Sequence, residues 1–286
     1  MQRRVLLYLS PAISVVVAGT ALATASPASA QTTVPCSTTA LVAAVANPGA
    51  GPVLELTPGC RYVLTSSLQV NQPLTIHGNN ARLTRDNSSG PFGIVKVHAN
   101  LNLDRITITN GDATASGPDF GGGIGVESGT LTLDRSTIRD NQGNFSGGIG
   151  GLSGTTIDIT QTMVSDNHAF NNGGGLVTDG TLKLERSRVV NNSADGKGGG
   201  IASDGHVTVN DSNINANSAG VGGGFANIGP GTATLTDTNV NDNRATNAPG
   251  GIDNEGGSLS VTLINSRVNG NTPTNCAPTV VVGCRN

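Results

Sequence analysis

The sequence has almost no aromatic side chains and few charged ones. Tryptophan is absent, tyrosine and phenylalanine number two and five, and Asp, Glu, Lys and Arg make up 12% of the 286 residues. Sugar-binding clefts usually present aromatic faces, so the composition argues against such a cleft. Nucleic acids and anionic membranes are bound through clustered Lys and Arg, and the scarcity of these residues argues against both as partners.

Beyond the first thirty residues, no apolar run has the length needed to span a bilayer. Residues 1–30 carry Arg3 and Arg4, then an apolar run interrupted by Ser10 and Pro11, and finally Ala-Ser-Ala before Gln31. This is the pattern of a cleaved secretory signal peptide, and the alternative is a membrane anchor. We expect a secreted, extracellular protein of residues 31–286 that is monomeric and does not insert into membranes. Cleavage removes two of 16 basic and none of 19 acidic residues, so the mature charge is 14 minus 19, or −5.

Only four cysteines are present, and four cysteines allow three pairings. We favour structural disulfides between Cys36 and Cys60 and between Cys276 and Cys284, because each pair is local and the two pairs lie at opposite ends of the chain. An exported chain passes through an oxidising compartment, which favours disulfides over free thiols.

The sequence after Cys36 predicts one short helix. Ser37 can cap a helix that includes Leu41, Val42 and Val45 and ends at Asn47-Pro48-Gly49. A short amphipathic helix ahead of many strands is best used to cover the exposed end of a core. We therefore expect an N-terminal cap at residues 31–60 and a C-terminal cap at residues 272–286.

Glycine is abundant, with 41 residues, and it recurs periodically. Pairs of apolar residues separated by one position start at intervals of 30, 26, 25, 25, 26 and 28 residues, which are the differences between the positions of Leu101, Leu131, Ile157, Leu182, Val207, Ala233 and Val261. A further aliphatic residue follows each pair. In the last six copies an asparagine stands three residues beyond it, at Asn141, Asn167, Asn192, Asn217, Asn243 and Asn271.

This repeat predicts an all-β fold, a single-stranded right-handed parallel β-helix of about nine coils with an N-terminal capping helix. Leucine-rich repeats have a similar period but a different leucine spacing. In a solenoid, equivalent residues stack at about 4.8 Å. The aliphatic ladders should therefore fill the core. The asparagines should adopt positive φ and bond to the coils above and below.

The glycine runs followed by an apolar residue, together with the Ile/Val-x-x-Asn copies, resemble secreted right-handed parallel β-helix proteins of the pectate-lyase-like superfamily. They are similar to the Gly-Gly-Ala-Ile and Phe-x-x-Asn repeats of polymorphic outer membrane proteins, with Ile or Val in place of Phe. The early Cys-helix-Cys segment and the ending that begins at Asn271 are similar to free secreted β-helix proteins of actinobacteria. The resemblance covers about residues 31–286 and implies fold and export, but no particular activity.

Enzymes of that superfamily suggest where to look for catalytic residues. Polygalacturonase-like members use adjacent aspartates and a Gly-His-Gly, and neither motif is present. Stacking does bring Asp140 next to Asp166, at about the carboxylate separation of a retaining glycosidase, with His168 nearby. Asp179 and Asp204 form a second stacked pair, a candidate binding site. The alternative for both pairs is ordinary turn chemistry, because Asp before Asn or Gly often caps its own backbone.

The sequence favours a secreted, non-catalytic surface or adhesion solenoid. The rival is a polysaccharide lyase or glycoside hydrolase acting through Asp140 and Asp166. An extracellular polysaccharide or a cell-surface component is the expected partner. No cofactor or resident metal is expected, although an incidental Ca²⁺ at the aspartates is compatible with the pattern. Ice binding is disfavoured, because the outward threonine columns are interrupted. The insertion at residues 112–119 and the neighbouring outward faces are where a ligand is expected.

Overall fold

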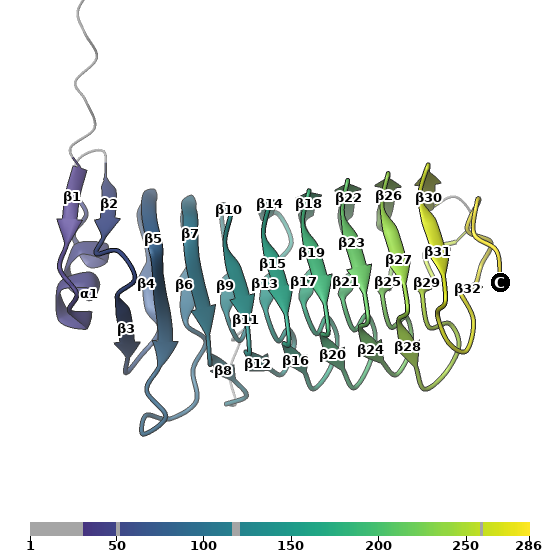
Figure 1. Ribbon diagram of the computed structural model, residues 1–286, viewed down its shortest axis with the longest axis horizontal. Helices are drawn as coiled ribbons and strands as arrows, with labels where there is room; N and C mark the ends of the chain where they lie inside the picture. Colours follow the sequence, from purple (N-terminus) through teal and green to yellow (C-terminus); the bar gives the residue numbers. More distant parts are fainter. Residues whose placement is uncertain (1–30, 50–51, 116–120, 258–259) are drawn as a thin grey trace, which may run out of the picture.

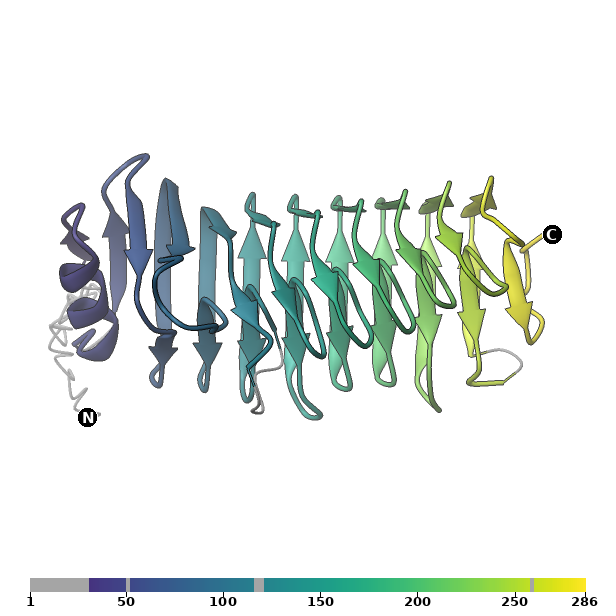
Figure 2. The same cartoon turned by 90° about the horizontal axis from the view of Figure 1, so that it is seen from below.

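The computed structural model describes residues 31–49, 52–115, 121–257 and 260–286. The predicted signal peptide and residues 116–119, half of the 112–119 insertion, lie outside these ranges, so the signal peptide stays a prediction. Within the described ranges the chain is an all-β parallel solenoid of about nine turns, with one short helix near its N-terminal end. The coils stack along one long axis, and α1 lies at the N-terminal end of the stack (Figures 1 and 2).

Three parallel sheets form the walls of the solenoid, and every strand pairs with its equivalent on the next coil. Sheet A contains β1 (Gln31–Val34), β2 (Val53–Leu56), β3 (Arg61–Leu64), β5 (Leu74–Arg85), β7 (Leu101–Thr109), β10 (Thr130–Asp134), β11 (Thr137–Arg139), β14 (Thr156–Thr160), β15 (Met163–Ser165), β18 (Thr181–Glu185), β19 (Arg188–Val190), β22 (His206–Asn210), β23 (Asn213–Asn215), β26 (Thr232–Thr236), β27 (Asn239–Asn241), β30 (Val261–Ile264) and β31 (Arg267–Asn269).

Sheet B contains β4 (Leu68–Val70), β6 (Val95–Val97), β9 (Ile124–Val126), β13 (Ile149–Gly151), β17 (Leu176–Thr178), β21 (Ile201–Ser203), β25 (Phe225–Asn227), β29 (Ile252–Asn254) and β32 (Cys276–Pro278). Sheet C contains the two-residue strands β8 (Asp112–Ala113), β12 (Gln142–Gly143), β16 (His168–Ala169), β20 (Ser193–Ala194), β24 (Ser218–Ala219) and β28 (Arg244–Ala245). Sheet C lies along the lower edge of the molecule in Figure 1.

The predicted aliphatic ladders form the core. Leu131 pairs with Leu101 on one side and with Ile157 on the other, in the predicted register. These side chains are fully buried, and one continuous core extends from Val34 to Val281. The glycine runs allow the coils to approach closely, because a Cβ on Gly174 would lie 2.3 Å from the carbonyl oxygen of Ser193.

The asparagine prediction is half right. The Asn167 Nδ2 donates to the Ile138 carbonyl oxygen at 3.0 Å and to Asn192 Oδ1 at 2.9 Å, and the same bonds recur along the buried ladder. The positive φ, however, belongs to the residue before each asparagine: Asp140, Asp166, Asn191, Ala216, Asp242 and Gly270. Asn110 makes the same corner on the preceding coil, where Gly111 follows it. The asparagines are buried and bond the stack, while the residue before each one makes the left-handed corner.

A second polar ladder was not predicted. Ser136, Thr162, Ser187, Ser212 and Thr238 are buried one after another along the stack. The Thr162 backbone N–H donates to Ser187 Oγ at 3.0 Å, and that hydroxyl donates to the Glu185 carbonyl oxygen at 2.7 Å. In the sequence this ladder is visible as a Ser or Thr five residues after the start of each apolar pair from Leu131 onward.

The helix expected after Cys36 is present. Helix α1 (Thr38–Ala46) begins after Ser37, whose side chain accepts a hydrogen bond from the Ala40 N–H, and it ends at Asn47. Leu41 and Val45 are buried, but Val42 is 45% exposed and does not belong to the apolar side. The Cys36–Cys60 disulfide joins the start of the helix to the first coil, as predicted.

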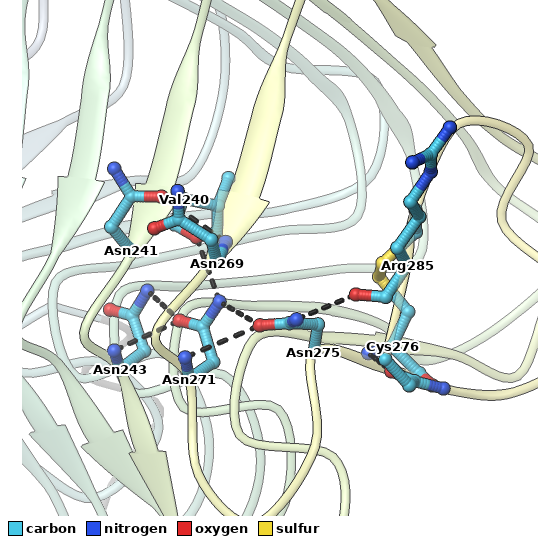
Figure 3. Close-up of a disulfide and its surroundings, with 10 residues drawn as sticks. Val240, Asn241, Asn243, Asn269, Asn271, Asn275, Cys276 and Arg285 are labelled. Carbon is cyan, nitrogen blue, oxygen red and sulfur yellow. Dashed lines mark hydrogen bonds between the residues drawn. A yellow bond between two sulfur atoms is a disulfide. The ribbon is translucent and has the colours of Figure 1, made fainter.

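At the other end, β32 pairs with β29, and the predicted Cys276–Cys284 disulfide closes the last turn. The asparagine ladder ends here on Asn275, which accepts a hydrogen bond from Asn271 Nδ2 at 2.9 Å and donates one to the Arg285 carbonyl oxygen (Figure 3). Asn275 therefore replaces the asparagine that a further coil would supply.

Candidate functional site

The side chains with the richest chemistry outside the core gather along sheet C. Each of its strands has one outward residue and one inward, small residue. The parallel register places the outward residues in one column: Asp112, Gln142, His168, Ser193, Ser218 and Arg244. Sheet C and the turn residues on either side of it are called the sheet C edge below. Inward, Ala169, Ala194 and Ala219 pack on one another and fix the strands.

A hollow of about 250 Å³ at this edge brings together all three predicted catalytic candidates. Its lining includes Asp140, Asp166 and His168, with Arg85 and Gln142 beside them. Arg85 comes from the end of β5, where its guanidinium lies 3.6 Å from the Asp112 carboxylate. The charge of Arg85 is therefore partly balanced by Asp112.

Asp140 and Asp166 stand directly after β11 and β15, which pair in register, so the two aspartates stack one coil apart. That spacing is about 4.8 Å between coils. Both adopt left-handed backbone conformations, with φ of 54° and 57°. The Asp140 carboxylate is bonded to the Arg139 guanidinium. Turn geometry alone accounts for an Asp or Asn at this position, because these residues tolerate positive φ better than most.

His168 links the hollow to the next coil. Its Nδ1 lies 2.9 Å from Ser193 Oγ, and its Nε2 lies 3.9 Å from Asp195 Oδ1. The ring of Phe170 meets the imidazole edge to face, with ring centroids 4.7 Å apart. His168 is thus held in place on one face of the edge while its side chain keeps about a third of its surface exposed.

A second hollow continues the edge toward the C-terminal end. It measures about 310 Å³ and is lined by polar groups that include Ser193, Asp195, Ser218, Arg244 and Thr246. Ser193 belongs to this hollow and also contacts His168 of the first one. The two hollows therefore follow one another along sheet C.

Asp179 and Asp204 do not join this site. They follow β17 and β21 at the end of sheet B, stacked on adjacent coils as predicted, and both are exposed. Partial desolvation, and then the negative charge of Asp204, raise the pKa of Asp179. The two aspartates stack at the end of sheet B, and neither of them lines the two hollows along sheet C.

Sequence reasoning missed a histidine held between carboxylates on sheet A. The His77 Nδ1 lies 2.6 Å from Asp104 Oδ1, and its Nε2 lies 3.7 Å from Glu55 Oε1. The register of β2, β5 and β7 places the three residues on successive coils. The irregular spacing of the first coils hid this column, because His77 comes before the repeat settles.

A buried acid was also missed. Asp253 of β29 is 1% exposed, and its Oδ2 has no hydrogen-bond partner. Nearby, the Lys197 ammonium is paired with the Glu255 carboxylate. Burial, and then the charge of Glu255, raise the pKa of Asp253 to about 6, against the opposing effect of Lys197. Nothing in the sequence pattern signals burial at this outward position.

Within the described ranges, no group of three or more His, Cys, Asp or Glu side chains is arranged to hold a metal ion. The described helix also lacks the length and apolarity that crossing a bilayer requires.

No protein-family model matches the sequence, and no curated protein matches it either. Among solved structures, the crystal structure of pectate lyase Pel9A superposes with a TM-score of 0.46 and 14% sequence identity, over 85% of this chain and 71% of that chain. The fold is a parallel β-solenoid.

Proposed function

We propose that this protein is a secreted, non-catalytic β-solenoid that binds an extended extracellular ligand, a polysaccharide or a cell-surface component, along the sheet C edge. The observation that carries the proposal is the run of two polar hollows in one straight line, with one outward side chain supplied by each coil. A linear polymer repeats its groups at regular steps, and the coils offer regular steps of about 4.8 Å.

Three further observations support it. Asp140 and Asp166 occupy the left-handed corner found on the other coils, so their presence is explained without catalysis. Both hollows are lined by equivalent turn and sheet C residues of successive coils. The two disulfides are compatible with an oxidising, extracellular environment.

A second candidate function rests on one arrangement, the stacked Asp140 and Asp166 pair with His168 beside it in the same hollow. A retaining glycosidase holds its two carboxyl groups about 5–5.5 Å apart. The alternative is therefore a polysaccharide lyase or glycoside hydrolase with these residues at its centre.

The two candidates are separated by testing the purified secreted protein against uronic-acid and neutral polysaccharides and against isolated cell walls, for retention and for new reducing or unsaturated ends. The proposal expects retention with no turnover. Turnover that is lost in Asp166→Ala would replace it with the enzyme. Absence of retention on every glycan and cell-wall preparation would remove binding as the function.

A further inference from the structure

The sheet C edge carries an unusual share of the exposed aromatic surface. Of the phenylalanines in the described residues, Phe92 and Phe225 are buried, whereas Phe145 and Phe170 are 44% and 50% exposed. Both exposed rings come from the turns that follow β12 and β16, on adjacent coils. The sequence has few aromatic residues, but two of them are exposed on adjacent coils at the sheet C edge. Sugars and cations stack on exposed aromatic rings that lie beside polar groups.

The charge around these rings is negative. Along the centre of the sheet C edge lie the carboxylates of Asp140, Asp166 and Asp195 and two cations, Arg139, which pairs with Asp140, and Lys197, which pairs with Glu255. These five groups sum to 2 minus 3, or −1. At the two ends of the edge the acidic and basic groups balance, since Arg85 lies beside Asp112 and Arg244 lies on the coil of Asp242. An anionic polymer would meet repulsion at the centre of the edge, and a cationic one would be attracted.

The spacing of the groups favours a glycan over a flexible polycation. Gln142, His168 and Ser193 present hydrogen-bonding side chains at one position per coil, in the same column. This regular step suits a stiff chain whose hydroxyl groups repeat along its length. A flexible polyamine or a basic peptide would use the carboxylates but not the hydroxyl-binding column.

Building on the proposed function, we infer that the ligand of the sheet C edge is a glycan of protonated amino sugars, with its ammonium groups on Asp140, Asp166 and Asp195, and its ring faces on Phe145 and Phe170. The carboxylates supply charge complementarity, and the exposed rings supply stacking and cation–π contact. His168 and Ser193 are positioned to bond the sugar hydroxyls.

The test measures binding of a glucosamine hexamer to the secreted protein by calorimetry, beside its fully N-acetylated counterpart, an oligogalacturonate and a short poly-lysine. The glucosamine hexamer should bind most tightly, and its affinity should fall as salt is added. Asp166→Asn should weaken binding about fivefold, the order expected of one exposed ion pair. Phe170→Ala should weaken it by up to about tenfold.

Matched variants separate binding from folding. Asp211→Asn replaces another exposed, left-handed aspartate away from the sheet C edge, and Ile264→Ala truncates an exposed apolar residue on β30. Both should leave affinity for the hexamer unchanged. Equal losses in Asp211→Asn and Asp166→Asn would overturn the assignment of the site.

The remaining outcomes are also distinct. Tighter binding of the acetylated hexamer or of oligogalacturonate would overturn the amino-sugar inference and leave the proposed function standing. If poly-lysine binds as tightly as the glucosamine hexamer, charge alone is recognised, and the amino-sugar inference is overturned as well. Failure to bind any of these glycans or whole cell walls would reject both proposals.

Discussion

A buried asparagine on each coil from Asn141 to Asn271 joins neighbouring coils through its side chain. Asn192 donates from Nδ2 to the Val164 carbonyl oxygen and to Asn217 Oδ1, while its Oδ1 accepts from the backbone N–H and the Nδ2 of Asn167. All four bonds are shielded from water. A buried polar group that loses its partner costs free energy, so each rung depends on the next.

Asn192→Ala should therefore lower the free energy of unfolding by about 3 kcal/mol, because it leaves buried donors on Asn167 without an acceptor. Urea unfolding followed by circular dichroism measures the change. Thr208→Ala, on the exposed outward side of β22, is the control and should change stability little. A similar, small change in both variants would show that the ladder contributes little.

The buried acid Asp253 makes stability depend on pH. Its pKa is about 6 in the folded protein against an ordinary value of 3.8, so the folded state holds the proton more tightly than the unfolded chain. Protonation thus favours folding, and the penalty for ionising Asp253 grows as pH rises from about 4 to about 6. Above that range the penalty is fully present.

Asp253→Asn and Asp253→Ala should remove this trend. The stability advantage of either variant over the parent should grow by up to about 3 kcal/mol between pH 4 and pH 7. Alanine suits position 253, because the residues that pair with Asp253 on the two neighbouring coils of sheet B are Ala226 and Ala277. Unfolding in urea at the two pH values checks this, and a pH-independent difference would contradict it.

At the scale of a residue, the sequence predicted spacing well and conformation less well. It placed Asn141 and its equivalents on a ladder and assigned them the positive φ that belongs to Asp140 and its equivalents. Two adjacent polar residues in a sequence do not show which of the two adopts the left-handed backbone conformation. The burial of Asp253 was also out of reach, because it depends on how neighbouring coils cover the outward side of sheet B.

At the scale of the element, each coil turns a tight corner after its second sheet A strand, at the left-handed position. Most coils place Asn, Asp or Gly there, which accept this conformation at low cost. One coil has Ala216, with a φ of 56° and an exposed side chain. Alanine in this conformation carries a penalty that its equivalents avoid.

Ala216→Asn should therefore raise the free energy of unfolding by about 0.5–1 kcal/mol, since Asn already serves this corner at positions 110 and 191. Ala216→Val should lower it, because a β-branched residue is the least tolerant of positive φ. The urea concentrations at the unfolding midpoints of the two variants, compared with that of the parent protein, measure both changes. A gain from valine, or a loss from asparagine, would show that the corner is not limited by backbone conformation.

Elements with a strong local signal were predicted from the sequence and the others were not. The helix after Ser37 and the sheet A strands have a cap and alternating apolar residues, and both formed where expected. The sheet C strands are two residues long and have no alternation to read. For that reason Asp140, Asp166 and His168 were predicted as a group, while the edge that they share with Ser193 and Arg244 was not.

At the scale of the whole molecule, the stack behaves as a one-dimensional array in which each coil contacts mainly its two neighbours. Intervals of 25 residues separate Ile157, Leu182 and Val207 within a closely regular region. Such an array should accept the loss of one complete unit without losing its fold.

Deletion of residues 182–206 places Val207 where Leu182 was and lets Asn217 stack on Asn167. The shortened protein should keep the circular dichroism of a β-solenoid, unfold at a lower urea concentration, and shorten by about 4.8 Å in small-angle scattering. Deletion of residues 182–194 breaks the register and should give aggregates. Soluble, folded protein from both deletions would argue against a strict coil register.

The ion pair between Lys197 and Glu255 joins residues 58 positions apart, whereas the ladders join immediate neighbours. Lys197 precedes β21 and Glu255 follows β29, so the pair bridges across the coil of β25 that lies between. The pair should couple the opening of these three coils, so amide protons on β21, β25 and β29 should exchange with similar protection. Lys197→Met should let the coils at the C-terminal end open separately from the others. The ion pair would thus oppose unwinding from that end.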